Sequence, residues 1–239
     1  MHDQIPPLPA SLRNHYQWLL ARSGAPPARL LDIGAGQGRL LSLARDVVRG
    51  RIVGIDPKPP GRSPDHPIAR VVGDGMRLPI ADRSFDFVVE TETLEWVRDP
   101  VRLLREAARV CTPDGLVVSD DTDWDTLVFA ASDAVLGRRI LRAFCDSGPN
   151  GWIGRMAPSL MRRAGLRDVQ VHVRVISEQI FKPGALGFWQ VQVIDEWLRA
   201  KALVTAQELA DWRADLQQAA DRGDYLFSAN RYVCVGRPA

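Results

Sequence analysis

A glycine-rich turn between two short apolar runs is the feature that most constrains the fold of this chain. Residues 30–33 read L-L-D-I, and the turn at 34–38 reads G-A-G-Q-G. The second run reads I-V-G-I at 52–55 and is followed by Asp56. A strand, a glycine turn, a helix and a second strand ending in a carboxylate are typical of a Rossmann-like α/β fold. Such a fold binds a nucleoside-sized ligand at its strand ends.

The spacing of the glycines and the charge beside them distinguish between nucleoside cofactors. Gly34, Gly36 and Gly38 read G-x-G-x-G, whereas a dinucleotide fingerprint places its third glycine one position later, where this chain has Arg39. Asp32, just before the turn, suits a cationic ligand better than a pyrophosphate. The pattern therefore favours S-adenosylmethionine, which carries a sulfonium and an ammonium, and disfavours an NAD-dependent oxidoreductase.

The residues around the turn have separate predicted roles. Glycine lets the backbone approach a ligand without a Cβ and allows a positive φ, and the next backbone N–H groups are placed to receive the methionine carboxylate. Asp32 supplies negative charge near the ammonium, and Asp56 is placed to accept hydrogen bonds from both ribose hydroxyls. The candidate cofactor residues of this region are Asp32, Gly34, Ala35, Gly36, Asp56 and Pro57.

Strand and helix patterns alternate through about residue 120, which predicts a doubly wound, mostly parallel sheet with helices on both faces. The seven expected strands are 30–33, 52–55, 68–72, 85–89, 116–119, 169–176 and 232–235. The expected helices are 11–21, 38–48, 101–111, 133–145, 159–164, 186–198 and 206–219. The last two helices form an insertion near the C-terminus, at about 184–222.

At 239 residues, we expect a single domain over 1–239. Its predicted parts are an N-terminal helical cover (1–28), a cofactor-binding half (29–124) and a substrate-side half (125–239) that contains the insertion. An apolar helix face serves a lid or a dimer interface equally well, so the sequence is compatible with a homodimer as well as with a monomer.

Composition excludes several classes of partner. Lys and Arg number 31 against 29 Asp and Glu, and no basic run is interleaved with aromatic residues, so we expect no nucleic acid. The first residues do not resemble a signal peptide and no apolar stretch is long enough to cross a bilayer, so we expect no membrane. Cys111, Cys145 and Cys234 are scattered, which predicts reduced thiols in a cytoplasmic protein. The four histidines form no ligand pair, so we expect no metal.

Further motifs follow the second strand in a fixed order. They are V-V-G-D-G-M at 71–76, L-P at 78–79, S-F-D-F-V-V at 84–89, L-E-W-V at 94–97 and R-E-A-A-R-V at 105–110 before P-D-G at 113–115. In these motifs the chain resembles the class I S-adenosylmethionine-dependent methyltransferases, in the small-molecule branch that includes the quinone C-methyltransferases. The resemblance covers roughly residues 29–120.

The resemblance implies roles for four further residues. It implies that Asp74 meets the adenine amino group, that Gly75 and Met76 line the adenine pocket, and that the backbone around Thr91 faces the methionine end of the cofactor. Trp96 stands where many relatives have a histidine, so an imidazole base is not available there.

The implied reaction displaces a methyl group from sulfur to a nucleophilic N, O or C atom. A general base helps only where that nucleophile must lose a proton. Asp121 and Asp123, just past the fifth strand, are the candidates for catalysis, with Asp125 beside them and Glu92 and Glu95 beyond the fourth strand. Those carboxylates also suit the alternative of complementing the cationic cofactor or capping a helix.

Two tryptophans are candidates for the substrate site. Trp124 and Trp152 suit the wall of a pocket for a flat or cationic acceptor, with core packing as the alternative. The predicted function is S-adenosylmethionine-dependent methyl transfer to an N or O atom of a small molecule, a secondary metabolite. The alternatives are C-methylation of a quinone-like ring and a binding protein that holds the cofactor without turnover.

Overall fold

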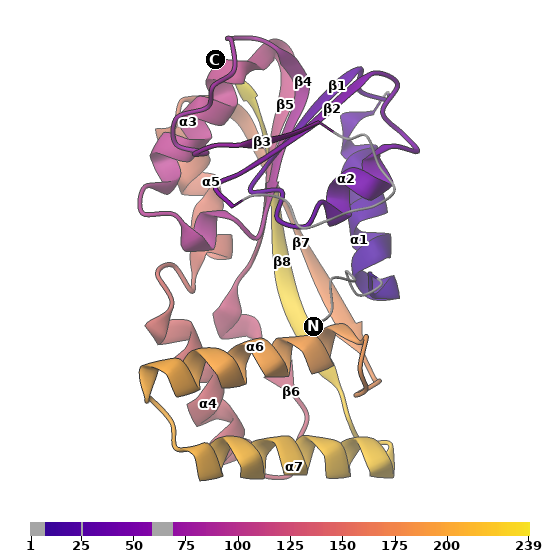
Figure 1. Ribbon diagram of the computed structural model, residues 1–239, viewed down its shortest axis with the longest axis vertical. Coiled ribbons are helices and arrows are strands. Elements are labelled where there is room, and N and C mark those ends of the chain that lie inside the picture. Colours follow the sequence, from indigo (N-terminus) through magenta and orange to yellow (C-terminus); the bar gives the residue numbers. More distant parts are fainter. Residues whose placement is uncertain (1–7, 25, 59–68) are drawn as a thin grey trace.

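A computed structural model describes residues 8–24, 26–58 and 69–239 of the chain (Figure 1). Residues 1–7 and 25 of the expected N-terminal cover lie outside the described residues. So does Ile68, the first residue of the expected third strand.

One sheet runs through the molecule in the strand order β3-β2-β1-β4-β5-β8-β6, and β7 pairs with β8. The strands are β1 (Arg29–Ile33), β2 (Arg51–Asp56), β3 (Ala69–Val72), β4 (Phe85–Thr91), β5 (Cys111–Thr122), β6 (Val128–Phe129), β7 (Leu166–Glu178) and β8 (Phe227–Pro238). Strands β1 to β5 pair in parallel, whereas β8 is antiparallel to β5, β6 and β7. The expected Rossmann-like fold is confirmed, with the two-residue β6 in addition to the seven expected strands.

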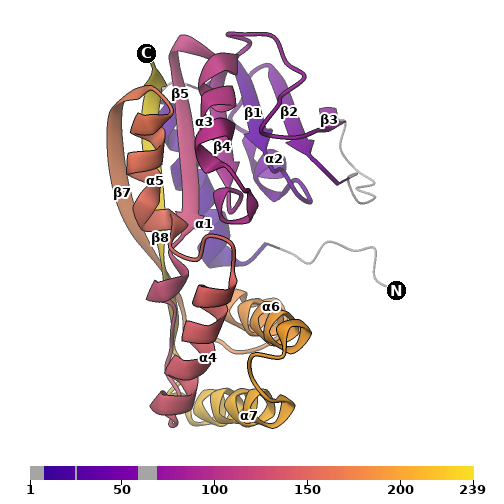
Figure 2. The ribbon, with the colours of Figure 1, turned by 90° about the vertical axis from the view of Figure 1, so that its left-hand side faces the viewer.

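Helices cover both faces of this sheet. They are α1 (Ala10–Leu20), α2 (Arg39–Ala44), α3 (Pro100–Val110), α4 (Ala134–Ser147), α5 (Ile153–Arg163), α6 (Leu186–Lys201) and α7 (Ala206–Arg222). Helices α1 and α2 pack on one face, and α3 and α5 pack on the other (Figure 2). Helices α4, α6 and α7 lie together beyond the end of the sheet where β4 and β5 finish.

The first strand shows why the sequence folds in this way. Leu30 packs with α1 and α2, whereas Leu31 and Ile33 pack with α3 and α5 on the opposite face. All three side chains are buried. A parallel strand covered on both faces must be apolar on both faces, so the one carboxylate within this strand, Asp32, needs a special reason for its position.

Several element boundaries differ from those expected from the sequence, and β5, β7 and β8 are each longer than expected. Helix α2 ends at Ala44, because the next residues turn back and bring Val48 into the core. Helix α5 begins at Ile153, earlier than expected, with Pro158 inside it. Proline lacks an N–H and is a poor indicator of a helix interior, which is why the sequence pattern pointed to a later start. Cys111, expected to end a helix, begins β5.

The last two helices form a hairpin between β7 and β8. Thr205 begins α7 with a capping box, in which its side chain accepts from the N–H of Glu208 and the Glu208 carboxylate accepts from the N–H of Thr205. Trp212 and Leu209 of α7 are fully buried in a core shared with α4 and α6. The hairpin therefore packs into an apolar core that it forms together with α4 and the start of β8. Among the described residues, no helix has both the length and the apolarity needed to span a membrane.

Two glycines offer a matched test of this packing. A Cβ at Gly54 of β2 would lie 2.5 Å from Leu41 Cδ1 and 2.9 Å from Ala35 Cβ, whereas one at Gly137 of α4 would meet only Trp212 Nε1, at 3.8 Å. We expect Gly54→Ala to lower the free energy of unfolding by about 1–3 kcal/mol through overpacking. We expect Gly137→Ala to raise it by about 0.8–1 kcal/mol through helix propensity. Urea denaturation measures both, and equal effects would contradict this account of the β2–α2 contact.

Candidate active site

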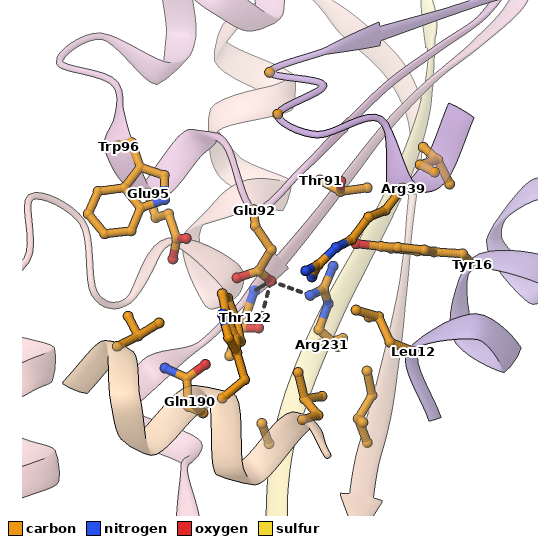
Figure 3. A pocket seen from close by; sticks show the side chains of 18 of the residues that line it. Leu12, Tyr16, Arg39, Thr91, Glu92, Glu95, Trp96, Thr122, Gln190 and Arg231 are labelled. Carbon is orange, nitrogen blue, oxygen red and sulfur yellow. Dashed lines mark hydrogen bonds and ion pairs between the residues drawn. The ribbon is translucent and has the colours of Figure 1, made fainter. Parts of the chain in front are cut away.

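A cavity of about 560 Å³ lies where β1, β4 and β5 end, between α1 and α6 (Figure 3). Its glycine-turn side is lined by Asp32, Gly34, Ala35, Gly36, Arg39, Lys58 and Thr91. Its opposite side is lined mainly by apolar and aromatic residues, together with the polar residues Glu92, Glu95, Thr122, Gln190 and Arg231. One cavity therefore connects the predicted cofactor turn to a second, mostly apolar space.

The turn after β1 requires glycine for two reasons. Gly34 and Gly36 have φ values of 76° and 48°, a conformation that L side chains rarely adopt. A Cβ at Gly34 would also collide with Thr93, whose hydroxyl donates to the carbonyl oxygen of Ile33 at 3.2 Å. The backbone of the turn therefore borders the cavity without side chains at these positions.

Asp32 is a buried carboxyl group beside this turn. It is 1% exposed, and its Oδ1 atom has no hydrogen-bond partner. Burial raises the pKa of Asp32 to about 8, although the nearby Arg70 acts in the opposite direction. Arg70 also donates to the carbonyl oxygen of Gly36. A positively charged ligand in the cavity would stabilise the ionised form of Asp32.

The other predicted cofactor carboxylates lie at the end of β2, which is Asp56, and on the loop that follows β3, which holds Asp74. Asp56 accepts from the backbone N–H of Gly36 and of Lys58, each at 2.9 Å, so it fixes the glycine turn relative to β2. Asp74 accepts from the N–H of Met76 at 2.8 Å. On the loop after β2, Lys58 does line the cavity. The predicted residues Asp56, Pro57, Asp74, Gly75 and Met76 do not border it.

A network of buried charges forms the floor of the cavity. Arg231 of β8 donates to both carboxylate oxygens of Asp120, at 2.9 and 2.6 Å, and also pairs with Glu92. His15 of α1 lies 2.8 Å from the same Asp120 carboxylate. Glu92 in turn accepts from the N–H and the hydroxyl of Thr122, at 3.0 and 2.7 Å. The network joins the first helix and the last strand to the ends of β4 and β5.

The buried carboxyl groups near this floor divide into two electrostatic classes. Burial alone would raise the pKa of Asp120, but Arg231 and His15 lower it below its ordinary value. Glu90 and Asp121 have no cationic partner of this kind. Burial raises the pKa of Glu90 to about 7 and that of Asp121 well above its ordinary value, and each carboxyl group acts on the pKa of the other. Its cationic neighbours therefore favour the charged form of Asp120, whereas burial favours the protonated forms of Glu90 and Asp121.

The structure places the two predicted catalytic carboxylates away from the cavity. Asp121 and Asp123 are fully buried and neither lines the cavity. Asp121 accepts from the Ser119 hydroxyl at 3.2 Å, and Asp123 accepts from Arg155 of α5 at 2.7 Å. Both side chains are thus held by structural partners on the α5 side of β5. The carboxylates that border the cavity are Asp32, Glu92 and Glu95.

The two predicted substrate-site tryptophans have different positions. Trp124 lines the cavity, is 9% exposed and donates its Nε1–H to Glu95. Trp152 is 43% exposed and does not line the cavity.

Sequence reasoning missed three polar residues that line the cavity: Arg39, Gln190 and Arg231. Arg39 was detectable, because it directly follows the glycine turn. Gln190 and Arg231 come from α6 and β8, and no local pattern places them together. No group of three or more potential metal ligands occurs in the described part of the chain.

Comparison with known proteins connects this geometry to a family. The family model described as "Methyltransferase domain" matches residues 31–119, from within β1 through the glycine turn to most of β5. This part of the chain is therefore a methyltransferase domain, and the match supports the resemblance to the class I S-adenosylmethionine-dependent methyltransferases. The cofactor of this family is S-adenosylmethionine, as the glycine spacing predicted. The matches do not distinguish the branch that contains the quinone C-methyltransferases.

Individual relatives cover part of this methyltransferase. An uncharacterized 37.1 kDa protein in transposon Tn4556 of Streptomyces fradiae is 32% identical over 173 residues, which are 68% of this chain and 50% of that protein. A malonyl-[acyl-carrier protein] O-methyltransferase of Geobacter sulfurreducens is 38% identical over 41% of this chain and 40% of its own length. The chain thus spans about half the length of these relatives, or less.

A solved structure extends the similarity over nearly the whole fold. The YcgJ protein of Bacillus subtilis is 18% identical and has a TM-score of 0.58, covering 94% of this chain and 98% of that protein. At this identity, the match supports the fold alone.

Replacing Asp32 with asparagine is expected to stabilise the cofactor-free methyltransferase at pH 8. A carboxyl group whose pKa is raised on folding costs stability as the pH rises from its unfolded pKa toward 8. Asp32→Asn should therefore raise the Tm at pH 8, by about 2–4 °C per kcal/mol regained, and have little effect near pH 4. Differential scanning calorimetry measures both, with the exposed Asp114→Asn as control. Equal Tm values for the two variants at pH 8 would contradict the assignment of the shift to Asp32.

Asp56→Ala is expected to weaken binding of S-adenosylmethionine by roughly 10- to 100-fold, because hydrogen bonds to a charged group contribute roughly 1.5–3 kcal/mol. The variant also removes the acceptor for the Gly36 N–H. Asp56→Asn keeps an acceptor oxygen for that N–H, so it separates loss of charge from loss of turn geometry. Calorimetric titration gives the Kd values, and an unchanged Kd for Asp56→Ala would remove Asp56 from the cofactor site.

Proposed function

We propose that this chain transfers the methyl group of S-adenosylmethionine to a nitrogen or oxygen atom of a small molecule, a secondary metabolite. The observation that carries the proposal is the joint cavity. Asp32, a buried carboxyl with an unpartnered oxygen, lies at the glycine-turn end, and a mostly apolar space lies at the other. A cationic cofactor and an apolar acceptor would therefore meet inside one enclosure.

The proposed cofactor residues are those expected from the sequence: Asp32, Gly34, Ala35, Gly36, Asp56, Pro57, Asp74, Gly75, Met76 and Thr91. Two features support the fit, namely the unpartnered carboxyl oxygen of Asp32 and the side-chain-free backbone at Gly34. Helix α2 has only six residues, so its N-terminus supplies little dipole for the methionine carboxylate. Arg39, whose side chain lines the cavity, supplies a full positive charge instead.

The protein's contribution to the reaction is mainly positioning. S-adenosylmethionine supplies a methyl group on a sulfonium, which is already a good leaving group. Tyr16 of α1 and Gln190 of α6 border the cavity from opposite sides, so these helices exclude water from the reacting atoms. Holding the methyl donor and the acceptor in line lowers the activation free energy by roughly 7–11 kcal/mol when near-attack geometry is maintained.

The regions with proposed separate functions follow one another along the chain. Residues 29–124 form the cofactor-binding half, residues 125–239 form the substrate-side half with the insertion at about 184–222, and residues 1–28 form the N-terminal helical cover, all within one domain of 239 residues. Of this cover, the described helix α1 borders the cavity through Leu12 and Tyr16. Trp124 is the proposed aromatic wall on the acceptor side. Trp152 lies outside the cavity, so a contact with the acceptor would need a ligand that extends beyond it.

Two steps test the proposal. A thermal-shift and calorimetric titration with S-adenosylmethionine and S-adenosylhomocysteine tests cofactor binding, with NAD as the competing ligand. Incubation with [methyl-13C]S-adenosylmethionine and a library of phenols, alcohols and amines then tests transfer, because the 13C chemical shift distinguishes methyl groups on O, N and C. We expect a Tm increase with both adenosyl ligands and a new O- or N-methyl signal.

Each other outcome identifies an alternative. A new C-methyl signal would replace this proposal with C-methylation of a ring. Cofactor binding without transfer to any library member favours a non-catalytic binding protein. A response to NAD, with none to the adenosyl ligands, would reject the proposed chemistry altogether.

A further inference from the structure

The apolar end of the cavity, called here the acceptor chamber, is bounded by Glu95, Thr122, Trp124, Phe144, Gln190 and Val193. The Trp124 and Phe144 rings meet edge to face, with centroids 5.4 Å apart. Trp96, which also lines the cavity, packs in the same manner on Trp197 of α6 at 5.5 Å. Such walls of flat apolar rings suit a ligand with a flat apolar body.

Gln190 is a buried polar side chain with unused hydrogen-bonding capacity. It is 3% exposed, and its side-chain nitrogen has no partner in the structure. Its amide rises from α6 into the cavity (Figure 3). A buried donor without a partner costs free energy, so the position of Gln190 is best explained by a ligand atom that accepts its N–H.

Glu95 is the second polar group of the chamber with unused capacity. It is 4% exposed and accepts one hydrogen bond, from Trp124 Nε1. Burial, Glu92 and Asp121 raise the pKa of Glu95, while Trp124 and Arg231 act in the opposite direction. The ionised form of Glu95 therefore binds a proton more strongly than an exposed glutamate does.

The permanent charges around the chamber are already paired. Arg231 is bound to Asp120 and Glu92, and Glu92 also accepts from Thr122. Arg39 and Lys58 line the glycine-turn side of the cavity. A negatively charged acceptor would therefore lose its hydration in the chamber without gaining an unpaired cation among the residues that bound it.

We propose that the chamber selects an uncharged acceptor with a flat apolar body and one hydroxyl group, whose hydrogen Glu95 accepts and whose oxygen accepts from the amide of Gln190. This inference rests on the proposed function and narrows its acceptor atom to oxygen. The oxygen of a hydroxyl has two lone pairs, so one receives the Gln190 N–H while the other attacks the methyl carbon. A neutral amine nitrogen has a single lone pair and cannot do both.

The reaction balances with residues already in the chamber. As the new C–O bond forms, the hydroxyl proton passes to the Glu95 carboxylate, and the C–S bond breaks with its electron pair on sulfur. The products are a methyl ether and S-adenosylhomocysteine, and Glu95 then returns the proton to water. The ether has no hydrogen for Glu95, so the product binds less tightly than the acceptor and is released.

Three probes of one shape separate these contacts by binding alone. They are 4-butylphenol, which both donates and accepts, 4-butylanisole, which only accepts, and butylbenzene, which does neither. Each is titrated into protein saturated with S-adenosylhomocysteine, and fluorescence of the tryptophans that line the cavity reports binding. We expect each lost hydrogen bond to weaken binding about three- to tenfold, in the order 4-butylphenol, 4-butylanisole, butylbenzene.

Two variants assign the two contacts. Glu95→Gln keeps an oxygen for Trp124 Nε1 and should abolish the preference for 4-butylphenol over 4-butylanisole. Gln190→Leu should abolish the preference for 4-butylanisole over butylbenzene. The matched controls are Glu196→Gln for Glu95 and Gln192→Leu for Gln190, both at exposed positions of α6. Both controls should leave the order of the three affinities unchanged.

The possible results separate this inference from the function on which it rests. Equal affinities for the three probes, or tighter binding of 4-butylaniline or 4-butylbenzoate than of 4-butylphenol, would overturn the selection of a neutral hydroxyl. If S-adenosylhomocysteine saturates the protein in the same experiment, the proposed function is retained whatever the probes show. If S-adenosylhomocysteine does not bind, the proposed function is rejected, and this inference with it.

Discussion

The ion pair between Asp120 and Arg231 is the interaction on which the cavity depends. Both side chains are buried, and an unpaired charge there would cost several kcal/mol. The pair requires β8 to lie antiparallel beside β5 in the observed register, in which Arg231 is opposite Thr122. His15 brings α1 to the same carboxylate. The first helix and the last strand therefore meet at the centre of the sheet, directly beneath the cavity.

A sheet with this many buried carboxyl groups must neutralise them, and it does so in two ways. Asp120 and Asp123 are neutralised by arginines from β8 and α5. Glu90, Asp121 and Asp32 lie outside these pairs, and burial raises the pKa of each. Of the two neutralised carboxylates, Asp120 with Arg231 forms the floor of the cavity, whereas Asp123 with Arg155 lies on the α5 side of β5. Within the second group, Asp32 lines the cavity, where a bound cation can restore its charge, so the energetic cost of burying it is linked to ligand binding.

The cofactor half was predictable because its signals are local. The apolar run at Leu30, the glycine turn and the carboxylates at the ends of strands are each encoded within a few residues. Proximity to the strand end did not indicate which side chains at the end of β5 lie toward the cavity. Alternate residues of a strand point to opposite faces, so Asp120 and Thr122 lie toward α1 and the cavity, whereas Asp121 and Asp123 lie on the α5 side.

The acceptor half was not predictable, because its polar groups come together only in the folded chain. Arg231 is placed by strand register, and Gln190 is placed by the packing of α6 against α4 and α7. The α6–α7 hairpin packs in an apolar core that it shares with α4 and the start of β8, whereas β1, which precedes the glycine turn, belongs to the other two cores. A change at an α6 position that faces the cavity therefore alters the acceptor chamber without disturbing β1, and acceptor specificity can diverge while the cofactor half is retained. The motifs shared with the methyltransferases include Glu95 but end before Thr122 and Gln190 of the acceptor chamber.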